Sequence, residues 1–182
     1  MEKDNRQLII DLKDENKRDL AFHTLVKEYQ ERLYWHIRKI VLNHEDADDI
    51  LQNTFVKAWR SIGNFREESS LYTWLYRIAT NESLTFINSN KRKSFVPMND
   101  TSEFLMNNLV SDPYFEGDEI QLKLQEAIVK LPDKQRLVFN MKYFEEMKYE
   151  EISEILETSV GALKASYHHA AKKIEEYIKN VE

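Results

Sequence analysis

The sequence predicts an all-α protein of two small helical domains joined by a linker, with a helix-turn-helix in the C-terminal domain. Apolar residues recur at spacings of three and four over most of the chain, which is the pattern of amphipathic α-helices. Only 3 Gly and 3 Pro occur in 182 residues, which argues against a turn-rich β protein. The periodicity lapses over residues 94–117, so we expect domains at 1–93 and 118–182 with a linker, 94–117, between them.

The N-terminal domain is predicted to contain three main helices. The first covers residues 18–41 with one apolar stripe. The second covers residues 47–62, and its polar face runs from acidic to basic, the order that the helix dipole favours. The Ser69-Ser70 pair is expected to cap the third helix. A weaker pattern indicates a short helix within residues 4–14.

The third helix combines aromatic side chains with a cation and an amide. Its exposed side chains are expected to include Tyr72, Tyr76, Arg77 and Asn81. Unpaired bases stack on aromatic rings while cations hold the phosphates, so this composition favours binding of single-stranded nucleic acid. The net charge of −6 does not exclude such binding, because the excess of positive charge lies within residues 57–93.

The C-terminal domain is predicted to contain four helical segments. The last two, residues 149–156 and 159 to about 178, are separated by Glu157-Thr158, which is the spacing of a helix-turn-helix. The start of the last helix is expected to present small residues and cations outward, as recognition of a major groove requires. These residues are Gly161, Lys164, Ala165, His168 and Lys172. By pattern alone, an ordinary helical hairpin with a solvated lysine face is an equally good interpretation.

Several classes of site are excluded by composition and motif. The chain has no cysteine, which excludes disulfides and thiolate metal sites. His44 and the acidic residues after it lack the spacing of a zinc or calcium site, so no metal and no cofactor is expected. No phosphate-binding P-loop is present. The N-terminus has the pattern of neither a signal peptide nor a membrane span, so we expect no direct membrane insertion and a cytoplasmic location.

Taken together, the two halves resemble bacterial sigma factors of the extracytoplasmic-function (ECF) group. Residues 46–61 and 65–81 are similar to sigma region 2, with the sequences DADDILQNTFVKAWRS and FREESSLYTWLYRIATN. Residues 131–174 are similar to sigma region 4. Both matches occur in the family's order and lack region 3 between them. The resemblance implies a protein without enzymatic activity that binds core RNA polymerase and directs promoter-specific transcription initiation.

The resemblance also implies a role for each surface. The polar face of the second helix would dock on the β′ clamp helices through Asp49, Gln52, Asn53 and Lys57. The minus-ten element would be opened and held by Asn64, Phe65, Arg66, Ser69, Ser70, Tyr76, Asn81, Lys91 and Arg92. The minus-thirty-five element would be read as duplex DNA by Lys164, Ala165, His168, His169 and Lys172. An outer apolar surface of region 4 would meet the β flap, and an anti-sigma factor is the expected regulatory partner.

Three departures from the family pattern involve four positions. Glu157 stands where the family usually has Gly, so we expect the turn to close without the positive φ that glycine allows. Ser166 and His169 replace two arginines that are common in the recognition helix, which weakens phosphate and guanine contacts. Asn53 replaces a common acidic residue on the clamp-docking face.

Two other functional classes are weighed against the sigma factor. A helix-turn-helix regulator acting alone would normally dimerise, but no heptad seam or dimerisation helix is evident. An enzyme acting on nucleic acid would need carboxylates or histidines gathered in a pocket, whereas the acidic residues here are predicted to lie on exposed helical faces.

Overall fold

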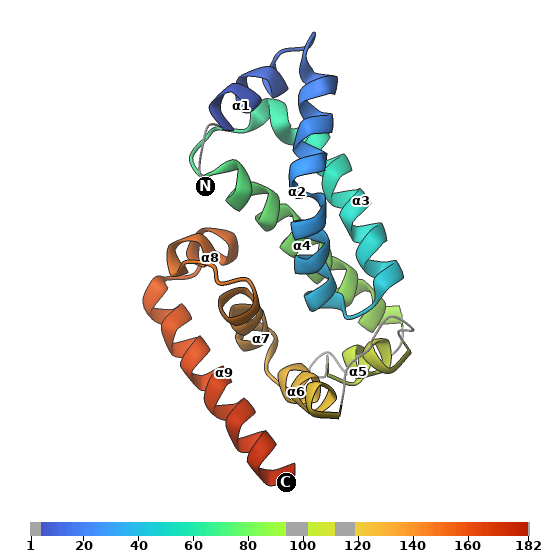
Figure 1. Cartoon of the computed structure of the whole chain (residues 1–182), viewed down its shortest axis with the longest axis vertical. Helices are drawn as coiled ribbons and strands as arrows, with labels where there is room; N and C mark the ends of the chain where they lie inside the picture. Colours follow the sequence, from blue (N-terminus) through green and yellow to red (C-terminus); the bar gives the residue numbers. More distant parts are fainter. Residues whose placement is uncertain (1–4, 94–101, 112–118, 182) are drawn as a thin grey trace.

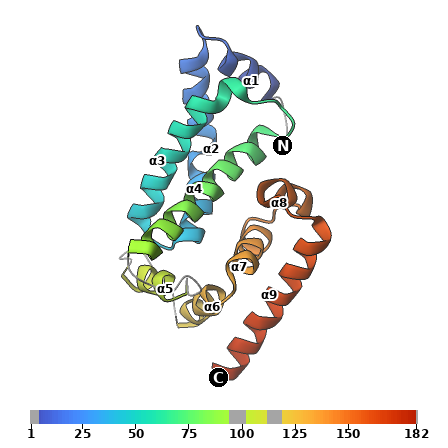
Figure 2. The ribbon, with the colours of Figure 1, turned by 180° about the vertical axis from the view of Figure 1, so that it is seen from behind.

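In the computed structural model, the described residues are 5–93, 102–111 and 119–181, and they are helical with no strand among them, which confirms the all-α prediction. Figure 1 shows α1–α4 on one side of the molecule and α6–α9 on the other, and Figure 2 shows the same division from behind. The α-helices are α1 (Asn5–Lys13), α2 (Arg18–Val41), α3 (His44–Ser61), α4 (Leu71–Lys93), α5 (Ser102–Ser111), α6 (Glu119–Val129), α7 (Asp133–Phe139), α8 (Tyr149–Leu156) and α9 (Val160–Val181). A 3-10 helix covers Ile62–Asn64, and a π-helix covers Asn140–Phe144.

The N-terminal unit is a bundle in which α2, α3 and α4 pack on one another. Helix α2 has the predicted bounds, and its apolar stripe is fully buried at Leu25, Leu33 and Ile37. The helix ends because Leu42 adopts a left-handed conformation with φ 59°. Asn43 then caps α3, and its side chain accepts a hydrogen bond from the backbone N–H of Asp46 at 3.0 Å.

Helix α4 begins where the serine pair predicts. The backbone N–H of Thr73 donates to Ser70 Oγ at 3.0 Å, which satisfies one of the free donors of the first turn. Behind this cap, Leu71, Leu75 and Ala79 are buried against the rest of the bundle. The capping geometry and the buried stripe therefore confirm the sequence prediction for this helix.

The predicted linker contains a helix of its own. This helix, α5, has ten residues. Leu105 is fully buried in the main hydrophobic cluster. Asn108 Nδ2 donates to the carbonyl of Val41 at 2.9 Å, which satisfies an acceptor left free at the C-terminal end of α2.

The C-terminal unit contains four helical segments, as predicted. Pro132 precedes α7, where its fixed φ suits a helix start. Arg136, only 3% exposed, donates from Nη1 to the carbonyls of Val129 and Leu131 and from Nη2 to Asp133 at 2.8 Å. Burial lowers the pKa of Arg136 from its ordinary value, and Asp133 opposes this shift. These bonds connect the end of α6 to the start of α7.

The turn between α8 and α9 departs from the prediction. Glu157 adopts φ 50° and ψ 45°, so the expectation that the turn would close without a positive φ is wrong. The left-handed residue allows the N–H groups of Glu157 and Thr158 to donate to the carbonyl of Ser153. These hydrogen bonds offset the cost of about 1–3 kcal/mol for a non-glycine residue in this conformation.

The two units share one hydrophobic cluster. Helix α8 packs against α4, and Met141, Ile152 and Leu163 belong to the same buried cluster as the core of α2 and α4. A second, smaller cluster lies within the C-terminal unit between α6, α7 and α9. The packing of the C-terminal unit therefore covers part of α4, the helix expected to bind nucleic acid.

We expect Glu157→Gly to raise the free energy of unfolding by about 0.5–1 kcal/mol, because glycine adopts φ 50° without a Cβ clash. The substitution also removes the 3.9 Å ion pair between Arg77 and Glu157, but this reduces the gain in stability only slightly, since both side chains are solvent-exposed. Urea unfolding followed by circular dichroism measures the change.

The matched control is Glu154→Gly, an exposed site within α8. Glycine there should lower stability by about 1 kcal/mol, because it loses helix propensity. If both variants lost the same free energy of unfolding, glycine would have no conformational advantage at residue 157.

Candidate nucleic-acid interface

The polar face of α3 is open to solvent. Asp49, Gln52, Asn53 and Lys57, the residues predicted to bind polymerase, are all exposed. Lys57 Nζ forms an ion pair with Glu82 of α4, so this cation also connects the two helices. The Asp49 carboxylate can accept hydrogen bonds from a partner helix, and the Gln52 and Asn53 amides can both accept and donate them. All three groups already lie at the surface.

Acidic charge gathers at the N-terminal end of the same helix. Glu45 and Asp46 lie in the first turn of α3, where the helix dipole stabilises negative charge. Burial raises the pKa of Asp46 above its ordinary value, and the neighbouring Asp49 and Glu45 add to this shift. The first turn of α3 therefore concentrates carboxylates close to the predicted polymerase-docking face.

An open apolar groove also lies along α2 and α3. It is lined by Phe22, Phe55, Val56, Trp59 and Arg60. The rings of Phe22 and Trp59 meet edge to face with centroids 4.9 Å apart. Val56 is 47% exposed, so the groove brings apolar surface next to the polar face of α3.

The loop before α4 separates one buried ring from exposed polar side chains. Phe65 is 6% exposed, and its ring lies 5.1 Å from that of Trp74. Asn64, Arg66 and Ser70 are exposed, and Ser69 is half-buried. Phe65 thus anchors the loop, while the amide of Asn64 and the guanidinium of Arg66 are exposed where they can meet a nucleic-acid strand.

Tyr76 does not have the predicted exposure. Its side chain is 3% exposed, so the expectation of an exposed ring is wrong. The ring lies 4.2 Å from Tyr72 and 4.8 Å from His36, between centroids. Burial raises the pKa of Tyr72 to about 12 and shifts the pKa of Tyr76 in the same direction, still further from the ordinary tyrosine value. The physical reason is that the ring packs beside His36 of α2 and Tyr72 of α4, which the helical periodicity of α4 alone does not reveal.

The remaining predicted residues of α4 lie beyond this covered region. Asn81 is exposed, and the side chain of Arg77 is 37% exposed. Lys91 and Arg92 belong to the last turn of α4, and their side chains lie outside the described part of the structure. Exposed polar side chains therefore come both from the loop before α4 and from α4 itself.

The start of α9 presents the predicted outward face. Lys164, Ala165, His168, His169 and Lys172 are all exposed, while Leu163 and Ala170 on the opposite side are buried. Lys164 Nζ lies 5.7 Å from the ring centroid of Tyr149 on α8, so the two helices of the helix-turn-helix support one another here. Small and cationic side chains on one open helical face match the requirements of a major groove.

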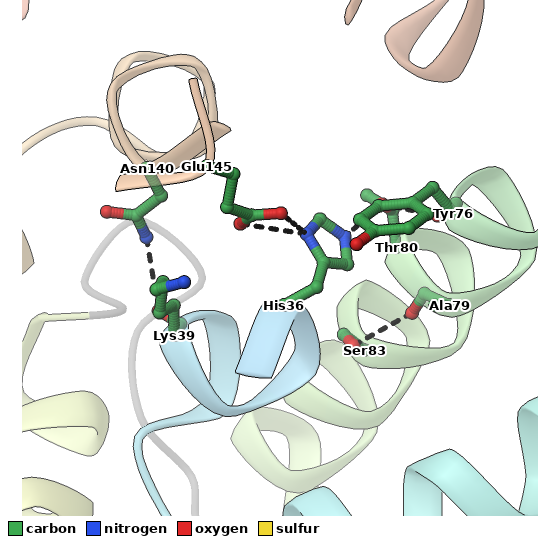
Figure 3. Close-up of polar contacts among 8 residues, drawn as sticks. All are labelled: His36, Lys39, Tyr76, Ala79, Thr80, Ser83, Asn140 and Glu145. Carbon is green, nitrogen blue, oxygen red and sulfur yellow. Dashed lines mark hydrogen bonds and ion pairs between the residues drawn. The ribbon is translucent and has the colours of Figure 1, made fainter. Parts of the chain in front are cut away.

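Sequence reasoning missed the polar contacts that join the two units. His36 of α2, only 1% exposed, faces Glu145 and Thr80, as Figure 3 shows. Asn140 Nδ2 donates to the carbonyl of Lys39 at 3.1 Å. The sequence did contain a clue to these contacts, because His36 lies beside Ile37 on the apolar stripe of α2. A polar side chain buried at such a position requires a hydrogen-bond partner.

Within the described parts of the chain, no group of three or more His, Cys, Asp or Glu side chains could hold a metal ion. Of the helices described, none is both long enough and apolar enough to cross a membrane. The exposed surfaces above are instead suited to protein and nucleic-acid partners, since they combine amides, cations and helical faces.

Comparison with protein families assigns both units. Residues 25–93 match Sigma-70 region 2, and residues 121–174 match Sigma-70, region 4. The first match covers most of α2–α4, and the second covers α6 to the middle of α9. The two regions follow one another in a single chain, as the sequence resemblance implies.

Relatives match almost the whole chain. The RNA polymerase sigma-H factor of Pseudomonas aeruginosa is 31% identical over 179 residues, which covers 94% of this chain and 92% of that protein. The ECF RNA polymerase sigma factor SigW of Bacillus subtilis is 31% identical over 169 residues, with coverages of 88% and 90%.

Solved structures share the fold. CnrH, in complex with the cytosolic domain of CnrY, superposes with a TM-score of 0.69 at 21% identity, covering 98% of this chain and 99% of that one. The sigma factor RpoE of Bartonella quintana, solved with the anti-sigma factor NepR, gives a TM-score of 0.66 at 20% identity, with coverages of 87% and 96%. These structures show that the fold is shared, and the family and sequence matches above lead to one assignment: the chain belongs to the ECF group of RNA polymerase sigma factors.

Proposed function

We propose that the chain divides promoter recognition between its two helical units while bound to core RNA polymerase. Region 2 would dock on the β′ clamp helices through the exposed face of α3 and open the minus-ten element with the loop before α4 and with α4 itself. Region 4 would read the minus-thirty-five element through α9. The observation that supports this division best is the order of the two sigma regions, each with an exposed polar face.

Tethering explains how modest contacts can give specificity. Neither DNA surface is strongly basic, and Ser166 and His169 occupy positions where arginines are common in the family. Two weak sites held on one polymerase bind at a high effective concentration, so their affinities combine. The proposal therefore requires polymerase for tight promoter binding and places the site of action in the cytoplasm, with the chromosome.

Two further contacts are part of the proposal. The exposed Tyr143, whose ring stacks on Phe139, offers apolar surface that region 4 could place against the β flap. An anti-sigma factor is the proposed regulatory partner, supported by the structural neighbour from Bartonella quintana, which was solved with one. No residue of this chain is assigned to that partner.

The direct test is reconstitution. Core bacterial RNA polymerase is mixed with the purified chain, and run-off transcripts are collected from a pool of genomic fragments. Specific initiation that depends on the added chain is the expected result, and alignment of the start sites yields the promoter. Polymerase binding without initiation, or no binding, would contradict the proposal, and tight binding of duplex DNA without polymerase would favour a regulator acting alone.

Asn81→Ala should impair promoter opening by about tenfold, a loss of about 1.4 kcal/mol, while holoenzyme assembly stays intact. Asn81 is exposed on α4 rather than on α3, and its loss is expected to remove contacts with the separated strand. Opening is followed by permanganate reactivity of thymines, and assembly is followed by fluorescence anisotropy of labelled chain with core polymerase.

The control for this variant is Asn16→Ala, an exposed asparagine between α1 and α2 that lies outside the proposed surfaces. It should leave both readouts unchanged. Loss of assembly in Asn81→Ala would move that residue from the DNA surface to the polymerase surface.

Lys164→Ala should weaken promoter recognition by about 1–3 kcal/mol if the ammonium group contacts a base edge. Competition between promoters that differ in the minus-thirty-five element measures the effect in the holoenzyme. Lys173→Ala, an exposed lysine roughly half a turn around the same helix, should have little effect. An equal loss on every promoter would assign Lys164 to a phosphate instead.

A further inference from the structure

His36 occupies an unusual position for an ionisable side chain. It lies on α2, is 1% exposed, and is enclosed by α4 on one side and by the segment after the π-helix on the other. A buried imidazole must satisfy both ring nitrogens, because an unpaired polar group inside a protein is costly. Figure 3 shows both nitrogens directed at partners from different units of the chain.

The first partner determines the role of Nε2. Thr80 has one hydroxyl proton, which it donates to the carbonyl of Tyr76 at 2.7 Å. Thr80 Oγ1 lies 2.8 Å from His36 Nε2, and with its own proton already used it can only accept in this contact. Nε2 must therefore carry a proton.

The second partner determines the role of Nδ1. This atom lies 3.1 Å from Glu145 Oε1 and 3.0 Å from Oε2. An ionised carboxylate only accepts hydrogen bonds, so Nδ1 must carry a proton as well. With protons on both nitrogens, the geometry is that of an imidazolium ion paired with a carboxylate. The Glu145 side chain is 10% exposed, so water screens this pair weakly.

The other charged and titratable groups around this pair come from three helices. Helix α2 contributes Arg32 and Lys39, α4 contributes Tyr72 and Tyr76, and α8 contributes Glu151. The two phenols stay neutral through the range where histidine titrates, since burial raises the pKa of both.

We propose that the His36–Glu145 pair makes closure of the two units dependent on pH. His36 and Thr80 belong to the N-terminal unit and Glu145 to the C-terminal unit, so the pair exists only when the units are packed together, here called the closed state. Loss of one proton leaves an imidazole that can donate to only one of its two acceptors, beside a poorly hydrated carboxylate. The closed state is therefore favoured at low pH, where the imidazolium is present, and is lost when rising pH removes its proton.

The consequence for transcription rests on the function proposed above. Tyr76, a residue assigned to the minus-ten element, lies beside His36 and is 3% exposed in the closed state. The proton dependence itself does not need that assignment, because it can be measured without polymerase or DNA. Failure of the sigma-factor tests and failure of this proposal are thus separate outcomes.

Energy transfer between two dyes measures closure in the full chain. The protein has no cysteine, so Glu28→Cys on α2 and Lys173→Cys on α9 provide two unique, exposed labelling sites. Transfer is recorded between about pH 5 and pH 8, where histidine charge changes. One proton released on opening raises the ratio of open to closed molecules by up to about tenfold per pH unit.

Two variants and one control define the result. His36→Gln and Glu145→Gln should each flatten the pH dependence, because neither can form the imidazolium–carboxylate pair. His23→Gln removes an exposed histidine from the same helix and should keep the full dependence. Circular dichroism at both ends of the range checks folding, and if His36→Gln does not fold, Glu145→Gln decides the outcome.

The proposal is overturned if transfer in the unaltered labelled chain does not change with pH. It is also overturned if Glu145→Gln titrates like the unaltered chain, or if transfer rises rather than falls toward pH 8. A flat response in His23→Gln would assign the titration to a different histidine and would equally overturn the assignment to His36.

Discussion

Burial of α2 is the constraint on which the rest of the structure depends. Its apolar stripe, fully buried at Ile37, is covered by α3 and α4 and so defines the N-terminal unit. The last carbonyls of the same helix lack partners within it, as at any helix end. Two of them, from Lys39 and Val41, accept hydrogen bonds from Asn140 and Asn108. One helix therefore organises its own bundle and also holds the linker helix and the C-terminal unit.

The distribution of charge explains how an acidic protein can serve at a promoter. The net charge is −6, yet carboxylates gather at the first turn of α3 while the exposed start of α9 has lysines and histidines. Interactions between surface charges fade over about 10 Å at moderate salt, so each surface responds mainly to its own charges. A polymerase contact and a DNA contact can thus coexist on a chain of acidic overall composition.

Much of the fold was predictable because it depends on short-range regularities. The bounds of α2, the cap at Ser70 and the outward face of α9 each follow from helical periodicity or from a side chain three residues from its partner. Contacts between distant residues were not predictable in this way. Tyr76 matches the pattern of an exposed position in α4, yet its ring is buried beside His36 of α2.

The turn at Glu157 shows a further limit. Residue preferences favour glycine at positive φ, but two hydrogen bonds to Ser153 allow a glutamate to adopt that conformation. The free-energy cost of a positive φ in a non-glycine residue is small, and two backbone hydrogen bonds can outweigh it. The identity of one residue therefore does not determine the geometry of the turn.

The sequence by itself determined the helical class, the order of the two units and the exposed polar faces of α3 and α9. It did so because periodicity, caps and motif spacing act within a few turns of helix. The tertiary structure alone decided that the units pack together, that Tyr76 is covered and that His36 meets Glu145, residues 109 positions apart. Such contacts depend on how whole helices bury their faces against one another, and no local pattern encodes that choice.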